Sequence, residues 1–254
     1  MMANRKARRS HLQKTEDQRC PVEQLREAIS VDDLLIEEFQ DLLQTNIDVQ
    51  ATDSLGKNIF HYILDDASEY KTHKLIATLI ERGVDPNRRE NEGNHPLLSA
   101  FMSRNNSLNL LDEEYNWIGW DFSGVNKKGQ SIFLSGVSAD IEGEALRNLT
   151  QHYDRIGYLE GLGWDINEKD RQGNNAAHLI AMNFLATHRC ESSHSFKDRC
   201  LSHISDLVLH GLDWNARNNV GDTFIHIVEK GGLKMRSEIM TTLHVAEVLR
   251  TSPY

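Results

Sequence analysis

Five side chains in the C-terminal half of the chain have the chemistry of zinc ligands. They fall within sixteen residues and are His188, Cys190, His194, Cys200 and His203. Thiolate sulfur and imidazole nitrogen hold zinc in tetrahedral sites, and a bound metal would order a segment with few apolar anchors. The spacings fit no standard zinc motif, so an ordinary polar segment is the competing interpretation. A zinc protein or a zinc enzyme therefore stays open as an alternative function.

Three other histidines, His61, His178 and His226, have the chemistry of general bases. A catalytic base also needs a nucleophile or a carboxylate within hydrogen-bonding reach. These three instead occupy one position of an internal repeat and are separated by whole repeats. The sequence contains no glycine-rich phosphate loop, nucleophile elbow or His-Glu-x-x-His helix. We therefore interpret the histidines as structural and expect no enzyme activity, no cofactor and no small-molecule substrate.

The repeat that positions these histidines is marked by five glycines in register. Each is followed five residues later by histidine or leucine, and the glycines are Gly56, Gly93, Gly129, Gly173 and Gly221. An acidic or amide residue stands shortly before most of these glycines, which is typical of a tight turn in which glycine takes a positive φ. Each block therefore predicts a hairpin tip.

A second pattern, glycine-x-Asp-x-Asn, lies between the tips at residues 83–87, 163–167 and 211–215. Before it, apolar residues recur at helical spacing, as at Leu75, Ile76 and Leu79. A glycine after such a run sits where a helix needs a positive-φ residue at its end. One helical unit cannot bury its apolar stripe alone, so the pattern predicts stacked units.

The two patterns in this order resemble the ankyrin repeat, in which Asp-x-x-Gly-x-Thr-Pro-Leu-His precedes two helices and Gly-Ala-Asp-Val-Asn. The resemblance covers most of Thr45 to Ile227, about four full repeats with a half repeat at each end. It implies an all-α solenoid of stacked helix-turn-helix repeats with short β-hairpin loops. It also implies that the five glycines are structural and that the repeated histidine holds a neighbouring turn by hydrogen bonds.

The same pattern sets the expected boundaries. Residues 1–20 form a basic tail, expected to be disordered, and residues 21–254 form one ankyrin-repeat domain. Its parts are an N-terminal cap and half repeat (21–50), four repeats (51–87, 88–123, 124–167 and 168–215) and a C-terminal capping repeat (216–254). Glycine spacings of 37, 36, 44 and 48 exceed the family's usual length of about 33. The excess is expected around residues 138–150 and 187–199.

Composition limits the function classes. A net charge of −10 argues against binding nucleic acid, no apolar run is long enough for a membrane span, and three cysteines without a framework indicate the cytoplasm. The run from Arg5 to Arg9 is an exception, since it could serve nuclear import or remain a solvated tail. The C-terminal segment 235–249 has helical apolar spacing and is expected to cap the stack with a polar outer face.

The ankyrin resemblance implies a protein partner, bound by the hairpin tips and the inner helices on the concave face. The residue pairs before the glycines, with one tryptophan interpreted as exposed, are the predicted binding residues: Ser54, Leu55, Asn91, Glu92, Lys127, Lys128, Arg171, Gln172, Asn219 and Trp214. Because the middle tips are basic in an acidic protein, they favour an acidic partner segment. A solvated tip without a partner is the competing interpretation.

The chain is also similar to the inhibitors and host-targeting effectors that bacteria and viruses encode as stand-alone repeat arrays. We therefore predict a non-enzymatic inhibitor, effector or adaptor, with a targeting subunit of a separate enzyme as a further alternative. Trp120 and Trp164 directly follow a repeat glycine and are expected to be buried.

Overall fold

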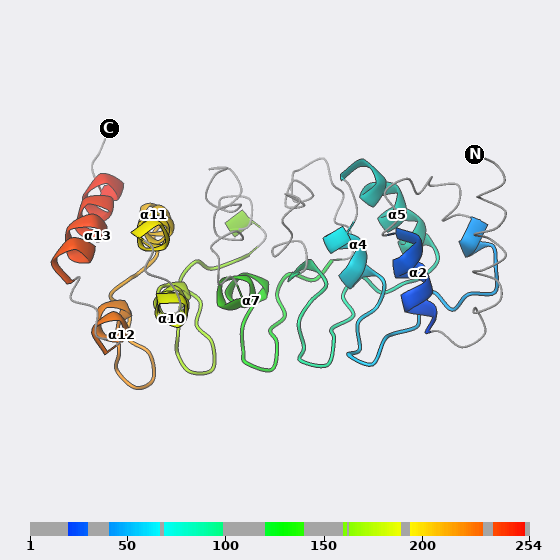
Figure 1. The fold of residues 1–254 in the computed structure, drawn as a ribbon, viewed down its shortest axis with the longest axis horizontal. Coiled ribbons are helices and arrows are strands. Elements are labelled where there is room, and N and C mark those ends of the chain that lie inside the picture. Colours follow the sequence, from blue (N-terminus) through cyan, green and yellow to red (C-terminus); the bar gives the residue numbers. More distant parts are fainter. Residues whose placement is uncertain are drawn as a thin grey trace.

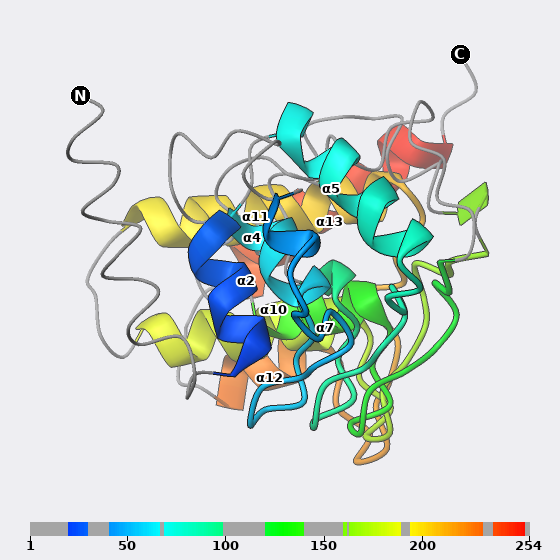
Figure 2. The same cartoon turned by 90° about the vertical axis from the view of Figure 1, so that its right-hand side faces the viewer.

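The computed structural model describes residues 20–29, 41–66, 69–98, 120–139, 160–161, 163–188, 194–230 and 236–251. Within these ranges the chain forms helices joined by turns, and no residue there lies in a strand. The helices stack along one axis, and the loops between repeats project to the same side of the stack (Figure 1 and Figure 2). The predicted all-α solenoid is confirmed.

The helices form two rows. The row beside the loops contains α2 (Pro21–Ile29), α4 (Phe60–Asp66), α7 (Ile132–Ala139), α10 (Ala176–His188) and α12 (Phe224–Lys230). The second row contains α5 (Glu69–Glu81), α11 (His194–Leu209) and α13 (Arg236–Thr251). Contacts run along each row, from α7 to α10 to α12 and from α11 to α13, and between the two rows. None of the described helices is long and apolar enough to cross a membrane.

One apolar core runs through the stack. It extends from Val22 on α2 to Ala246 on α13 and includes Phe60, Leu134 and Leu207. Small residues allow the rows to approach closely, since Ala176 and Ala177 at the start of α10 are fully buried. Each repeat therefore completes the burial of its neighbours, as a solenoid requires.

The longest repeat has the longest helix of the row beside the loops after α2, since α10 has 13 residues against 7 in α4, 8 in α7 and 7 in α12. Its second helix, α11, has 16 residues, as does α13. Because α10 ends at His188 and α11 begins at His194, part of the extra length expected at 187–199 extends these two helices. The other expected insertion, at 138–150, lies almost wholly outside the described residues, as do the basic run at residues 5–9 and most of the tail.

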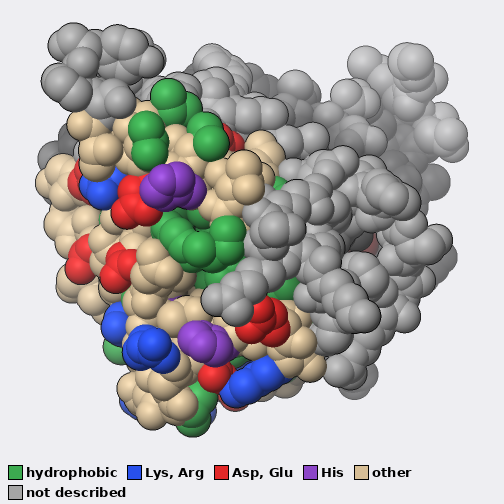
Figure 3. All heavy atoms as spheres, turned by 90° about the vertical axis from the view of Figure 1, so that its left-hand side faces the viewer, with side chains coloured by type: hydrophobic (Ala, Val, Ile, Leu, Met, Phe, Trp, Pro, Cys, Tyr) green, Lys and Arg blue, Asp and Glu red, His purple; other side chains and the backbone are tan. Residues whose placement is uncertain are grey.

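The C-terminal helix differs from the expected polar cap. α13 buries Leu243 and Ala246 against the stack, but its other side exposes Met240, Val245, Val248 and Leu249. The outer face is therefore mixed and not polar throughout as expected, because Thr241, His244 and Arg250 are exposed beside these apolar residues. Hydrophobic side chains are visible on this end of the molecule (Figure 3).

Candidate functional site

The five hairpin tips are closed by the same pattern of hydrogen bonds. In the tip around Gly173, one Asp170 Oδ1 accepts the backbone N–H groups of Gln172 at 2.9 Å and Asn174 at 2.8 Å. The Gly173 N–H donates to the Asp170 carbonyl at 2.9 Å, with φ of 77° at the glycine. Equivalent bonds are made by the residue three before each of the other glycines: Asp53, Glu90, Asn126 and Asn218. The tips are therefore rigid turns.

Backbone hydrogen bonds also join each tip to the tip before it. The donor and acceptor pairs are Asn91 N to Leu55 O (2.8 Å), Lys127 N to Glu92 O (3.0 Å), Arg171 N to Lys128 O (3.0 Å) and Asn219 N to Gln172 O (2.9 Å). This ladder uses only main-chain atoms of the predicted binding pairs. Their side chains project from a fixed backbone and, except for Asn91 and Asn219, can change without loss of the ladder.

Two of the predicted binding residues also support the ladder with their side chains. Asn91 Nδ2 donates to the Ser54 carbonyl at 3.0 Å, and Asn219 Nδ2 donates to the Arg171 carbonyl at 2.9 Å. A partner that bound these amides would have to replace those bonds. Their arrangement therefore favours a structural role, which the sequence pattern did not distinguish from binding.

The middle tips present free positive charge. Lys127, Lys128 and Arg171 are exposed, and in the described part of the chain none of the three forms an ion pair with a carboxylate. The residues four positions before Gly173 and Gly221 are exposed Lys169 and Arg217, which are not among the predicted binding residues. Lys169 Nζ donates to the Arg217 carbonyl at 3.2 Å. The repeat register itself is the signal that would have found these two residues.

Apolar side chains lie at both ends of the row of tips. Leu55 near the N-terminal end is 55% exposed, and Val220 on the last tip is 79% exposed. Val125, four residues before Gly129, is 51% exposed. The row thus combines a basic middle with isolated apolar contacts, a composition that suits contact with a protein chain.

Trp214 is not on the surface, so the expectation that it is exposed, on which its place among the predicted binding residues rested, is wrong. It is 5% exposed, and its buried indole nitrogen has no hydrogen-bond partner among the described residues. Burial alternates along this segment, since Leu212 and Trp214 are buried while Asp213 and Asn215 are exposed. Trp120 is buried as expected, at 8% exposure, and Trp164 is half-buried, with its Nε1–H donating to Glu168 at 3.0 Å.

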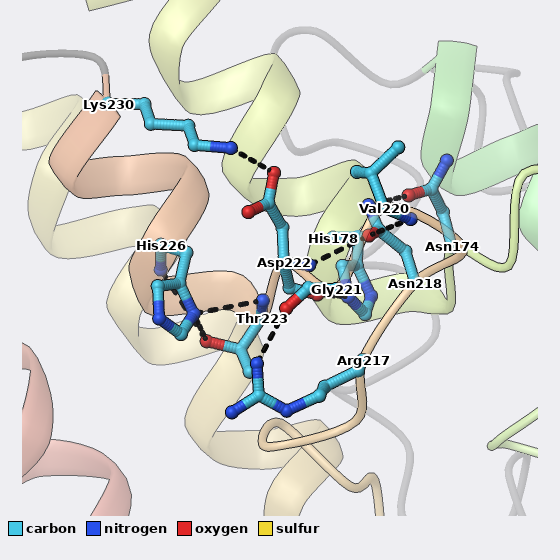
Figure 4. Close-up of polar contacts among 10 residues, drawn as sticks. All are labelled: Asn174, His178, Arg217, Asn218, Val220, Gly221, Asp222, Thr223, His226 and Lys230. Atoms are coloured by element: carbon cyan, nitrogen blue, oxygen red, sulfur yellow. Dashed lines mark hydrogen bonds and ion pairs between the residues drawn. The ribbon is translucent and has the colours of Figure 1, made fainter.

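The repeated histidines fix the start of each inner helix. Nδ1 of His61, His178 and His226 accepts the backbone N–H three residues earlier, each time at 3.2 Å. On the other side of the ring, His178 Nε2 donates to the carbonyl of Asp222 in the next tip at 2.9 Å (Figure 4). Burial lowers the pKa of His61 to about 4 and also lowers the pKa of His178, so both rings are neutral at pH 7.

Asparagine side chains of the second pattern also connect repeats. Asn167 Oδ1 accepts the backbone N–H of Asp213 at 2.7 Å, and its Nδ2 donates to the Gly211 carbonyl at 3.0 Å. Asn87 accepts equivalently from Asp121 at 2.6 Å. Asn87 and Asn167 of the second pattern are therefore structural, because each joins its repeat to the next one.

Of the five candidate zinc ligands, only His203 has a side chain that the structure describes. The side chains of His188, His194 and Cys200, and Cys190 as a whole, lie outside the described residues. His203 is described and is 7% exposed on α11. No group of three potential ligands exists among the side chains that are described.

Known structures place this architecture in context, although no protein family and no curated protein matches the sequence. The ankyrin repeat protein EF0377 is similar over 87% of this chain and 97% of that chain, with 17% identity and a TM-score of 0.56. An ankyrin repeat domain, ABAYE2397 from Acinetobacter baumannii, gives 87% and 96% coverage, 20% identity and a TM-score of 0.54.

A third similar chain comes from the structure of the predatory endopeptidase Bd0816 from Bdellovibrio bacteriovorus in complex with the immunity protein Bd3460. It covers 87% of this chain and 96% of that chain, with 18% identity and a TM-score of 0.51. These likenesses establish the fold. The chain folds as an ankyrin-repeat solenoid.

Proposed function

We propose that the chain is a non-enzymatic protein-binding module that acts as an inhibitor, effector or adaptor. The observation that carries the proposal is the row of hairpin tips, whose backbone is fixed by hydrogen bonds while the side chains of Lys127, Lys128 and Arg171 are exposed. A preorganised surface loses little conformational entropy when a partner binds, which favours affinity. The similarity to a chain in an endopeptidase and immunity protein complex supports enzyme inhibition as one form of this function.

The partner segment is acidic. Lys127, Lys128 and Arg171 have no carboxylate partner in the described part of the chain, although the whole protein carries a net charge of −10. A local positive row on an acidic protein directs an acidic segment to one place and repels it elsewhere. The apolar Leu55, Val125 and Val220 would add contacts that do not depend on salt.

A charge-neutral variant tests the proposal. In Lys127→Gln/Lys128→Gln/Arg171→Gln the ladder is preserved, because the residues contribute main-chain atoms to it. Glutamine also retains part of the Arg171 stem, which lies against Gly129. The matched control is Arg82→Gln/Arg88→Gln/Arg250→Gln, which removes the same charge at exposed residues outside the tips.

Each form is used as bait with a cell lysate, and retained proteins are identified by mass spectrometry. The proposal predicts a partner that wild type and the control retain and that the tip variant loses. If all three forms retain the partner equally, the binding site lies outside the basic tips and the proposal is wrong. Circular dichroism of each bait establishes that its helical content is unchanged.

A further inference from the structure

The last hairpin tip, at the C-terminal end of the solenoid, has the same structure as the earlier tips, but the described residues do not provide it with the contacts that each earlier tip makes to the next one. Gln172 O accepts the Asn219 N–H of the next tip, whereas no described N–H reaches the equivalent Val220 O. A Cβ on Gly173 would lie 2.4 Å from Asn219 Oδ1, but no atom of the described residues lies within 4 Å of that position on Gly221. His226 is exposed, although its equivalent His178 is fully buried. Figure 4 shows this last tip and its contacts.

Helix α13 extends the same end face with apolar side chains. Leu243 and Ala246 face the stack and are buried, while Val245 is 52% exposed and Val248 is 48% exposed on the opposite side. Val245 and Val248 are three residues apart, so they share one helix face. Thr241 and His244 are also exposed on this side, so the outer side of α13 carries an apolar group, Val245, Val248 and Leu249, beside polar residues. Scattered exposed hydrophobic residues need no explanation, but a group on one end face marks a contact surface.

The charge of this end face differs from that of the whole chain. Between Arg217 and Lys230 and between Met240 and Thr251, the cations are Arg217, Lys230 and Arg250 and the carboxylates are Asp222, Glu229 and Glu247. Three positive and three negative charges give a net charge of zero, against −10 for the protein. Two copies of an acidic protein repel one another over most of their surfaces, but this face approaches a copy of itself without that cost.

We propose that this end face binds the same face of a second copy of the chain, with α13 of one copy packed against α13 of the other across a two-fold axis. A two-fold contact requires a surface that complements itself, and an apolar group of side chains with balanced charges around it meets that requirement. The hairpin edges do not carry the contact. In the last tip the N–H groups of Asn219 to Thr223 are all used within the chain, so two such edges would present only carbonyls to each other.

The dimer is independent of the proposed partner site, since it uses α13 and leaves the basic tips accessible. It is tested with the full chain by light scattering after gel filtration and by sedimentation velocity, from micromolar to near-millimolar concentration. Wild type is expected to approach twice the 29.0 kDa of one chain as concentration rises. Because the face is apolar and neutral, added salt is not expected to weaken the association.

The test variant is Val245→Asp/Val248→Asp, which should raise the dissociation constant at least about tenfold. The matched control is Leu55→Asp/Ile80→Asp, which adds the same charge at residues that are 55% and 37% exposed and lie away from α13. The control should associate like wild type. Circular dichroism and thermal unfolding establish that both variants fold. A wild-type mass that stays at 29.0 kDa, or equal association of wild type and the valine variant, would overturn the proposal.

Discussion

Replacing Gly173 by alanine tests whether the ladder of tips joins the repeats. Gly173 has φ of 77°, and a left-handed backbone costs a non-glycine residue about 1–2 kcal/mol. The new Cβ would also lie 2.8 Å from the Asn219 backbone nitrogen, closer than any real contact. The next tip must therefore move, which strains the Asn219 bonds to Gln172 O and Arg171 O. Each such bond is worth about 1 kcal/mol.

The expected loss for Gly173→Ala is thus about 3–4 kcal/mol of unfolding free energy. Two controls isolate the contact between tips, because Gly163 and Gly221 have φ of 90° and 85° but no atom of the part that the structure describes lies within 4 Å of the Cβ position. Their alanine variants should lose only about 1–2 kcal/mol. Urea unfolding followed by circular dichroism measures all three losses. Equal losses at the three positions would refute the reasoning, because they would show that backbone conformation alone sets the cost.

Two further predictions concern buried side chains. Acid should destabilise the protein between about pH 6.5 and 4, because unfolded His61 binds a proton at its ordinary pKa of 6.5 while burial lowers its folded pKa to about 4. Urea midpoints at pH 7 and pH 4.5 should therefore differ less in His61→Gln than in wild type, and an unchanged difference would contradict this. Trp214→Ala should cost about 3–5 kcal/mol of unfolding free energy, because the ring is buried. A loss below about 0.5 kcal/mol would instead indicate a surface residue.

The sequence predicted the fold well because the tips depend on local chemistry. A positive φ at glycine and an acceptor three residues earlier leave a signature in one short segment, and that signature recurs. Bonds between tips were not predictable in the same way. Asn91 and Asn219 have the composition of exposed binding residues, and only the approach of the neighbouring tip shows that their amides are occupied.

The burial of Trp214 was not predicted, because residues 211–215 were expected to form an extended segment with the tryptophan side chain exposed. Leu212, Asp213, Trp214 and Asn215 alternate between buried and exposed, and that two-residue period was already present in the sequence. The outer face of α13 was misjudged for a different reason. Its polar residues suggested a cap, but the turn of the helix places Val245 and Val248 together on the exposed side.

The central claim is that a partner binds the basic tips, and the salt dependence of its affinity is the most direct measurement. The purified partner is titrated calorimetrically into wild type and into Lys127→Gln/Lys128→Gln/Arg171→Gln at low and high salt. The account predicts that wild type loses affinity as salt rises, that the variant binds more weakly at low salt, and that the two converge at high salt. Equal affinities at low salt would contradict it.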